Sequence, residues 1–396
     1  MDPTITRRRA LIIGTQLAIA AAACGVPERL GWRRPLPRFL RTLRVPPVLQ
    51  PVRTDATTDY YEITQRPGSA EILPGIRTPI WGFEGLFPGP TIRARRGRTT
   101  IIRQTNQLAV PTAVHLHGGA VPAESDGFPT DVIAPGTSRT YVYPNDQPAA
   151  TLWYHDHAMH QTGRNIYMGL TGLYLIEDEE ERALGLPGGR YDVPLLIQNR
   201  ALGSDGRFGY DRNRNLGATG DLVLVNGVPW PRMPVCARRY RFRVVNGANA
   251  TVYRLALSSG RPLVQIATDL GFLPAPVETA DVPLAMSERV EFVIDFSPYP
   301  IGTRIILRNL AADGPQAELM CFDVVCAERD ASVLPSRLRT VERIPTDSAT
   351  RTRELFSPAG RPLFHPLLGG RSTGRASIRT ARSLRRDWVT PRSGAS

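Results

Sequence analysis

The sequence contains no lysine, and all 49 of its basic residues are arginine, against 36 acidic residues in a chain of 396. Such a bias indicates a GC-rich genome, in which arginine codons replace lysine codons. The net charge of +13 is therefore weak evidence for a nucleic-acid partner. Because the arginines are dispersed, with an excess only at the two ends, we expect no nucleic-acid partner.

Cysteine is scarce, with four residues at Cys24, Cys236, Cys321 and Cys326. A straight strand would place Cys321 and Cys326 on opposite faces and too far apart for a disulfide. We therefore predict that Cys236, Cys321 and Cys326 are small buried hydrophobic residues.

A long apolar run is also lacking, and the longest candidate, residues 11–23, is too short for a comfortable membrane span. It follows Arg7-Arg8-Arg9, a pattern typical of an export signal. We predict a twin-arginine-type signal peptide over 1–26 and a periplasmic, cell-surface or extracellular protein without a stable membrane span. A plain secretory signal and a lipoprotein anchored at Cys24 are the less favoured alternatives.

Long amphipathic helices and a βαβ rhythm are absent, whereas 35 glycines and 36 prolines divide the chain into short strand-like runs. This spacing predicts an all-β protein of sandwich domains. We expect an extended Pro/Arg-rich arm over 27–54, a first domain over 55–182 and a second over 183–335. For 336–396 we expect a linker and a disordered basic tail, which is either natural or produced by a frameshift. The acids of residues 178–181 and Asp269 are predicted to be surface charges.

Four of the six histidines form two pairs, His115-Leu116-His117 and His155-Asp156-His157. Each pair lies in a strand-like run, where residues i and i+2 face the same way. Each pair therefore presents two imidazoles side by side, and the two pairs can meet within one β-domain. Neutral imidazole suits copper, zinc, iron and nickel, so these four residues are candidate metal ligands.

The residues around these pairs carry a specific resemblance. The segments "FPGPTIRARRG", "HLHGG" and "DGFPTDVIAPGTSRTYVYPNDQPAATLWYHDHAMHQTGRNIYMGLTGLYLIED" resemble the first cupredoxin domain of multicopper oxidases. The resemblance is nearest to bacterial spore-coat laccases and bilirubin oxidases. It is dense over 55–178 and looser through 325, and it implies two cupredoxin-like Greek-key β-sandwich domains.

The resemblance also implies roles for the four histidines. His115 matches a ligand of the type 2 copper, and His117, His155 and His157 match ligands of the type 3 coppers. Members of the family oxidise phenolic or similar substrates by one electron at a time. They reduce O2 to water by four electrons at a trinuclear copper centre.

The third-domain motifs of the family are not matched in this sequence. Only His160 and His365 follow His157, and no cysteine adjoins a histidine. We therefore expect the third cupredoxin domain and the type 1 copper site to be missing and the trinuclear centre to be half built. We also expect a truncated or frameshifted chain with little activity alone. The alternative is a non-catalytic, exported copper-binding or scaffold protein, similar to a cell-division protein that keeps this fold without its copper ligands. Retention of all four histidines argues against that loss.

Several neighbouring residues have two interpretations. Asp126 and Asp131 match a loop near the family's oxygen channel, where an acid can supply protons, but turn formation explains them equally. Met159 and His160 are expected to shape the pocket, and Trp153 and Tyr154 to pack in the core. We expect self-association through an exposed surface of the first domain.

Overall fold

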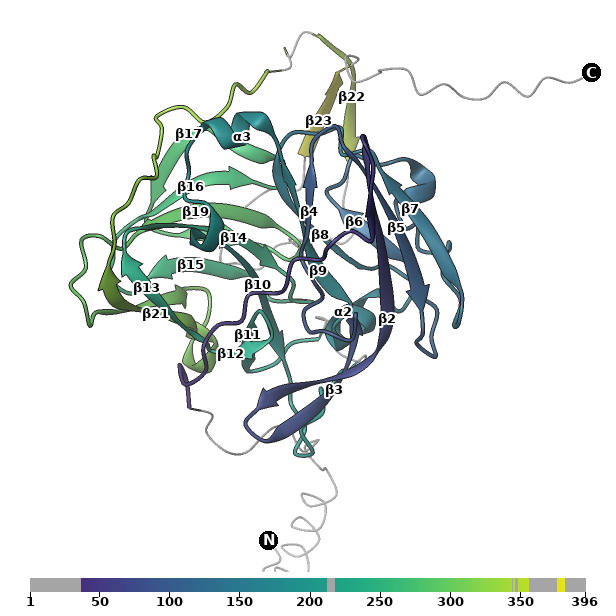
Figure 1. Ribbon diagram of the computed structural model, residues 1–396, viewed down its shortest axis with the longest axis horizontal. Helices are drawn as coiled ribbons and strands as arrows, with labels where there is room; N and C mark the ends of the chain where they lie inside the picture. The colour runs from purple at the N-terminus through teal and green to yellow at the C-terminus, as the bar shows by residue number, and fades with distance from the viewer. Residues whose placement is uncertain (1–36, 212–217, 344, 346–347, 356–375, 382–396) are drawn as a thin grey trace, which may run out of the picture.

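The computed structural model describes residues 37–211, 218–343, 345, 348–355 and 376–381 (Figure 1). The predicted signal peptide over 1–26 and the residues 356–375 and 382–396 of the predicted tail lie outside the described residues. Among the described residues, no helix has the length and apolar character needed to cross a membrane.

Two hydrogen-bonded sheets form the first half of the fold. The five-stranded sheet has the order β1-β2-β5-β7, with β3 paired to β2. The four-stranded sheet has the order β4-β9-β8-β6. Their bounds are β1 (Arg53–Thr54), β2 (Thr58–Leu73), β3 (Ile76–Phe83), β4 (Ile92–Arg95), β5 (Thr99–Asn106), β6 (Val114–His117), β7 (Ser138–Tyr143), β8 (Ala150–Asp156) and β9 (Thr171–Glu177).

Two further sheets form the second half. The seven-stranded sheet has the order β12-β11-β10-β14-β19-β16-β17, and the five-stranded one β13-β21-β20-β15-β18. Their bounds are β10 (Asp192–Arg200), β11 (Leu222–Val225), β12 (Val228–Pro229), β13 (Arg232–Ala237), β14 (Arg239–Asn246), β15 (Tyr253–Leu257), β16 (Leu263–Thr268), β17 (Gly271–Thr279), β18 (Val282–Leu284), β19 (Arg289–Asp295), β20 (Arg304–Asn309) and β21 (Glu318–Ala327).

The helices are short. Within the described residues, the α-helices are α2 (Thr162–Met168) and α3 (Glu179–Ala183), and the 3-10 helices are η1 (Ala123–Ser125), η2 (Gly189–Tyr191) and η3 (Gly314–Ala317). The predicted all-β architecture is therefore confirmed. The predicted boundary between residues 182 and 183 stays a prediction. Every strand of the first two sheets precedes this boundary, and every strand of the two further sheets follows it.

Each pair of sheets encloses an apolar core. In the first half, Ile63 of β2 and Tyr141 of β7 share a buried cluster with Leu116 of β6 and Leu152 of β8. In the second half, a larger cluster joins strands of both sheets, including Phe242 of β14 and Phe322 of β21. Two β-sandwiches result, because each strand buries one of its alternating faces against the opposite sheet.

The described part of the predicted arm, residues 37–52, connects the two sandwiches. Thr42 forms a bridge with Arg232 of the second sandwich, and Val48 forms one with Thr91 of the first. In Figure 1 the arm crosses the front of the molecule between these two points. Residues 37–52 therefore hold both sandwiches through backbone hydrogen bonds.

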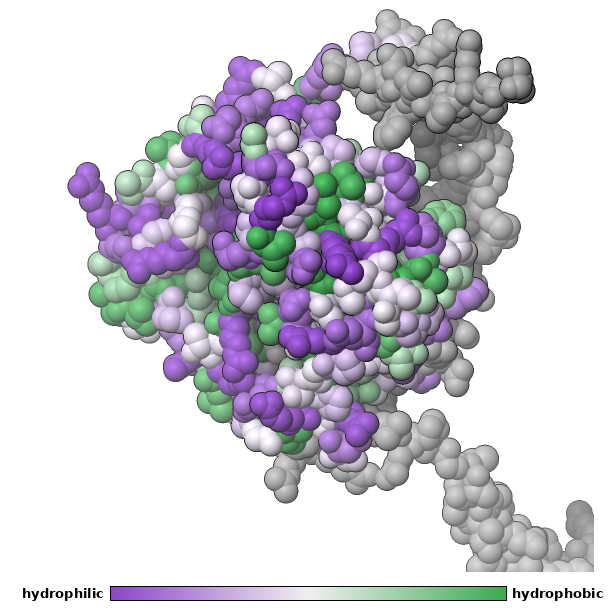
Figure 2. Space-filling model, turned by 45° about the vertical axis from the view of Figure 1, so that its right-hand side comes forward, coloured by the Kyte–Doolittle hydropathy of each residue, from purple (hydrophilic) through white to green (hydrophobic). Residues whose placement is uncertain are grey.

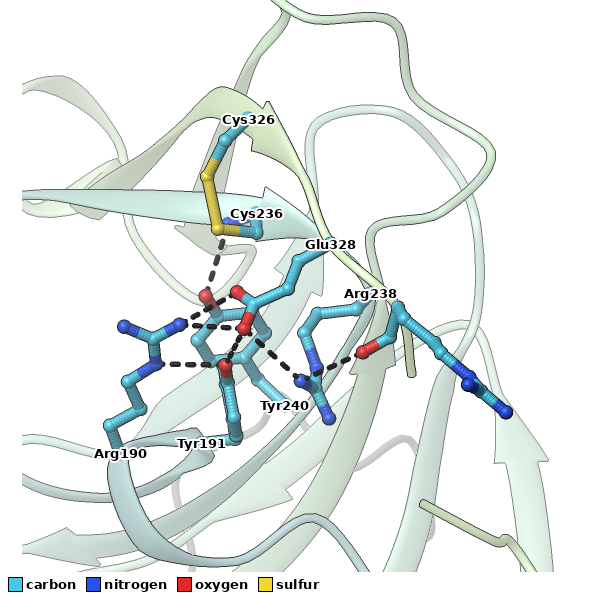
Figure 3. Close-up of a disulfide and its surroundings, with 8 residues drawn as sticks. Arg190, Tyr191, Cys236, Arg238, Tyr240, Cys326 and Glu328 are labelled. Carbon is cyan, nitrogen blue, oxygen red and sulfur yellow. Dashed lines mark hydrogen bonds and ion pairs between the residues drawn. A yellow bond between two sulfur atoms is a disulfide. The ribbon is translucent and has the colours of Figure 1, made fainter. Parts of the chain in front are cut away.

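The prediction for two cysteines is wrong, because Cys236 and Cys326 form a disulfide (Figure 3). Their strands, β13 and β21, pair in parallel, and a bulge after Val235 brings the two cysteines opposite each other with a Cα–Cα distance of 4.5 Å. Local spacing could not reveal the partner of Cys326, because Cys236 lies on a strand that is distant in the sequence. Cys321 is free and buried, as predicted.

The prediction that the acids of residues 178–181 are surface charges is wrong for two of them. The Asp178 side chain is 5% exposed and pairs with Arg339, and that of Glu181 is 8% exposed and pairs with Arg241 and Arg243. The short helix α3 begins at the Asp178 cap, whose carboxylate accepts a hydrogen bond from the Glu181 N–H. The Glu181 side chain faces the interior, where the two arginines compensate its charge.

The structure also differs from the tail prediction at two segments. Residues 349–355 (β22, Ala349–Leu355) and 376–381 (β23, Ala376–Ala381) form an antiparallel pair of strands. Composition alone predicted no regular structure there, because amino-acid composition carries no information about which segments pair as strands.

The face shown in Figure 2 mixes hydrophilic and hydrophobic residues, and the hydrophobic ones form small separate groups. Scattered apolar residues of this kind are ordinary on protein surfaces.

Candidate metal centre

The two histidine pairs lie on neighbouring strands of the four-stranded sheet. Strands β6 and β8 pair antiparallel, with His115 opposite His155 and His117 opposite Trp153. His157 directly follows the end of β8, and its backbone N–H donates to the Ala113 carbonyl. The register of this one ladder brings all four imidazoles together.

The distances within the cluster suit a metal ion. The ligand atoms of His115, His117 and His155 all lie within 4.8 Å of one another. The ring centre of His157 lies 5.2 Å from that of His115 and 5.8 Å from that of His155. The His157 Nδ1 atom is buried without a hydrogen-bond partner, so a nitrogen lone pair remains available there.

Backbone carbonyl groups orient two of the rings. The His115 Nδ1–H donates to the Asp126 carbonyl at 2.7 Å, and the His155 Nδ1–H donates to the Asp156 carbonyl at 2.8 Å. Each bond leaves the Nε2 atom with its lone pair, which is the form that binds a metal. The loop can approach because Gly127 has no side chain: a Cβ atom there would lie 2.1 Å from the Val114 carbonyl oxygen.

The residues between the paired histidines point away from the cluster, as the alternation predicts. Leu116 lies in the core of the first sandwich. The buried Asp156 carboxylate accepts hydrogen bonds from the Ala113 and Ala158 N–H groups and from the Asn165 side chain. These bonds fix the turn that carries His157, a role that the sequence pattern did not reveal.

The environment keeps two of these histidines neutral. Burial, followed by the charge of Arg289, lowers the pKa of His117 to about 4. Burial also lowers the pKa of His155 well below its ordinary value, although its hydrogen bond to the Asp156 carbonyl opposes the change. Both rings are therefore unprotonated at neutral pH and can donate a lone pair to a metal.

Two residues at the cluster were not singled out as contributing to it. Trp153 is buried, as predicted, but its ring also lies 4.2 Å from that of His155 and 5.4 Å from that of His117, centre to centre. Arg289, from β19 of the second sandwich, packs against Gly118. The position of Trp153 two residues before His155 was a usable signal, whereas nothing local marked Arg289.

The two predicted acids differ in position. The Asp126 Oδ1 atom lies 3.3 Å from the His115 Nδ1 atom, whereas Asp131 forms an ion pair with Arg139. Met159 and His160 are exposed just beyond the cluster. Tyr154 is buried in the core as predicted, and its hydroxyl donates to the Pro90 carbonyl.

The cluster is partly open. His155 is 4% exposed, and the other three rings are half-buried. Phe128 and Met159, in the two loops beside the cluster, are exposed by 60% and 46%. The backbone N–H of Met159 donates to the Pro129 carbonyl, so these two loops are in direct contact.

Comparisons with known proteins match this geometry to one family. Residues 65–181 match the family model described as multicopper oxidase. The chain is 36% identical to a laccase of Bacillus subtilis, over 81% of this chain and 72% of the laccase. It is also 36% identical to a bilirubin oxidase of Albifimbria verrucaria, over 77% of this chain and 58% of the relative.

Other matches extend this picture. A cell division protein FtsP of Escherichia coli is 35% identical, over 73% of this chain and 60% of the relative. The crystal structure of a multi-copper oxidase from Pediococcus acidilactici is similar with a TM-score of 0.73 and 30% identity, over 80% of this chain and 69% of that chain. The fold is thus that of cupredoxin-type sandwiches. Because the chain is 36% identical to the Bacillus laccase over 72% of that relative, and the family model covers the strands of the histidine cluster, the chain belongs to the multicopper oxidase family.

Proposed function

We propose that His115, His117, His155 and His157 are copper ligands, with His115 at the type 2 position and the other three at type 3 positions. The observation that carries this proposal is the convergence of imidazoles from β6 and β8, with three ligand atoms within 4.8 Å of one another. The chain's own groups prepare the site, because the Asp126 and Asp156 carbonyls fix the ring orientations. Bound copper supplies one-electron chemistry with dioxygen, which these side chains lack.

The proposed reaction class is oxidation of a phenolic or similar reducing substrate with O2 as the electron acceptor. In this chain only His160 and His365 follow the cluster, and no cysteine adjoins a histidine. We therefore propose that the chain contributes half of the ligands of a trinuclear centre, carries no type 1 site and has little activity alone.

Asp126 is the better placed of the two acids to supply protons. Its carboxylate lies beside His115 and is 47% exposed, so it can exchange protons with solvent next to the cluster. Asp131 is held by Arg139 instead.

A second candidate function is a non-catalytic, exported copper-binding or scaffold protein. The identity with the cell division protein FtsP favours it, although that relative's role extends to this chain only as a hypothesis. Export rests on the Arg7-Arg8-Arg9 pattern, in the undescribed N-terminal region. Exposed Phe128 and Met159 support the proposal of self-association through the first sandwich.

Copper titration of the purified full chain tests the metal proposal. We expect wild type to bind copper, and His155→Ala and His117→Ala to lose at least about tenfold in affinity, because each removes a converging ligand. The matched control is His160→Ala, which removes an exposed histidine beside the cluster and should leave the affinity unchanged.

Parallel titrations and an oxidation assay separate the alternatives. Equal affinity in wild type and His155→Ala would refute the site. Tight zinc binding with weak copper binding would instead indicate a tetrahedral zinc site. Copper binding with little phenol oxidation is the result expected for this chain alone, whereas robust phenol oxidation by it would overturn the proposal of a half-built centre.

A further inference from the structure

Arg289 is a buried cation that reaches the histidine cluster from the other sandwich. Its side chain is 4% exposed, although it starts at the first residue of β19 in the second sandwich. The Nε–H donates to the Thr151 carbonyl of β8, the strand that carries His155. The Nη2 atom lies so close to Gly118 that a Cβ atom added there would be 2.4 Å from it. The guanidinium is thus packed beside the residue that follows His117.

The guanidinium is held in one position. It donates to the Ser287 carbonyl at 3.1 Å and to the Asp269 carbonyl at 3.0 Å, and it forms an ion pair with the Asp269 carboxylate at 2.8 Å. The Asp269 side chain is 38% exposed, so water screens its charge more than that of the buried arginine. A net positive charge therefore remains at the edge of the cluster.

A fixed positive charge acts unequally on the two oxidation states of copper. Repulsion grows with the charge of the metal, so Cu2+ is disfavoured more than Cu+. The effect is strong where the cation is buried, because the effective dielectric constant is lower than in water.

We infer that Arg289 is a positioning residue of the metal centre whose buried charge favours Cu+ over Cu2+ at the four histidines. This inference rests on the proposed copper site. The four ligands all come from the first sandwich, and Arg289 of the second sandwich acts on the copper they hold through its charge.

The test measures the Cu+ and Cu2+ affinities of the full chain by competition with a chelator specific for each ion. We expect Arg289→Met to lower the ratio of Cu+ to Cu2+ affinity by roughly tenfold, because the charge is lost. Arg289→Lys, which keeps the charge, should retain most of the ratio. Asp269→Asn should raise the ratio, because it removes the compensating carboxylate. The control is Arg308→Met, which removes an exposed charge on the opposite sheet of the same sandwich.

The outcomes distinguish this inference from the copper proposal. If wild type binds no copper, both are overturned. If wild type binds copper but a folded Arg289→Met variant keeps its ratio, only the role of Arg289 is overturned. If that variant does not fold, Asp269→Asn and Arg289→Lys decide, and an unchanged or lowered ratio in Asp269→Asn rejects the inference. Circular dichroism and thermal melting establish folding for each variant.

Discussion

Three rings of the histidine cluster contact residues outside the paired pattern. The carbonyl of Asp126 orients His115, and Trp153 stacks on His117 and packs at a tilt against His155. The loop that approaches β6 and the turn that follows this strand both require glycine, since Gly127 packs on the Val114 carbonyl and Gly118 on Arg289. A metal site that must be held within fractions of an ångström needs such support.

The contact at Gly118 leads to a stability prediction. Gly118 has a φ of +84°, and a Cβ atom there would lie 2.4 Å from the Arg289 Nη2 atom. Gly118→Ala should therefore lower the free energy of unfolding by about 2–4 kcal/mol, from backbone strain and overpacking together. The matched control is Gly97→Ala, where φ is +74° but nothing lies within 4 Å, so only the strain of about 1 kcal/mol applies. Chemical denaturation of the metal-free protein measures both, and equal losses would show that Arg289 does not restrict this position.

At the scale of elements, a buried ionic network joins the two sandwiches. Arg241 and Arg243 of β14 pair with Glu181 of α3 and Glu291 of β19. Thr151 of β8 donates to Glu291 at 2.7 Å, which connects the network to the strand carrying His155. Asp192, at the start of β10, completes it by binding Arg243.

The network predicts acid sensitivity. Burial alone would raise the pKa of Asp192, but the charges of Arg243 and Arg241 outweigh it and hold this pKa well below the ordinary 3.8. Because the folded pKa is lower than the unfolded one, the stabilisation is complete above pH 3.8 and is lost as the pH falls below it. Asp192→Asn should cost about 3 kcal/mol at neutral pH and should flatten the loss of stability in acid.

Denaturation of wild type and variants between neutral and acidic pH checks this prediction. The control is Asp281→Asn, which disrupts the ion pair with the exposed Arg254 and should cost less than about 1 kcal/mol. Parallel pH profiles for wild type and Asp192→Asn would contradict the assignment of acid sensitivity to this network.

At the scale of the whole molecule, the histidine cluster lies in the first sandwich and is supported from the second. The arm bridges both sandwiches, and Arg289 extends from β19 to β8. The four proposed ligands thus lie in one sandwich that is held to the other by the arm and by Arg289. Comparison with the Bacillus laccase covers 72% of that relative.

The cysteines predict the spectrum of the copper-loaded chain. A type 1 site needs a thiolate beside imidazole ligands, but among the described residues Cys236 and Cys326 are bonded to each other, and Cys321 lies in β21 of the second sandwich, whereas the described histidines all lie between residues 115 and 160. We expect no intense blue absorption and negligible oxidation of phenolic substrates by this chain alone. The visible spectrum of the copper-loaded chain measures the blue absorption, and His155→Ala serves as the control for unbound copper. A blue band that disappears in Cys321→Ala would contradict the prediction.

Part of the fold and site follows from local pattern. Alternation along strands placed His115 with His117 and His155 with His157, and turned Leu116 and Asp156 away, because side chains in a strand repeat every two residues. The spacing of glycine and proline predicted the all-β class, because turns formed by these residues divide the chain into short strands. The resemblance around the histidines predicted the family that the comparisons confirm.

The sequence by itself determined the strand class, the face of each histidine pair and the family. Only the tertiary structure decided that His115 lies opposite His155, that Cys326 bonds to Cys236, and that Glu181 is buried against Arg241 and Arg243. It also brought Arg289 beside Gly118. These contacts join residues far apart in the chain, and they are selected by strand register and by the free energy of burying the sheets together. The periodicity of a local segment contains neither the register of its pairing with a distant strand nor the free energy of burying two sheets together.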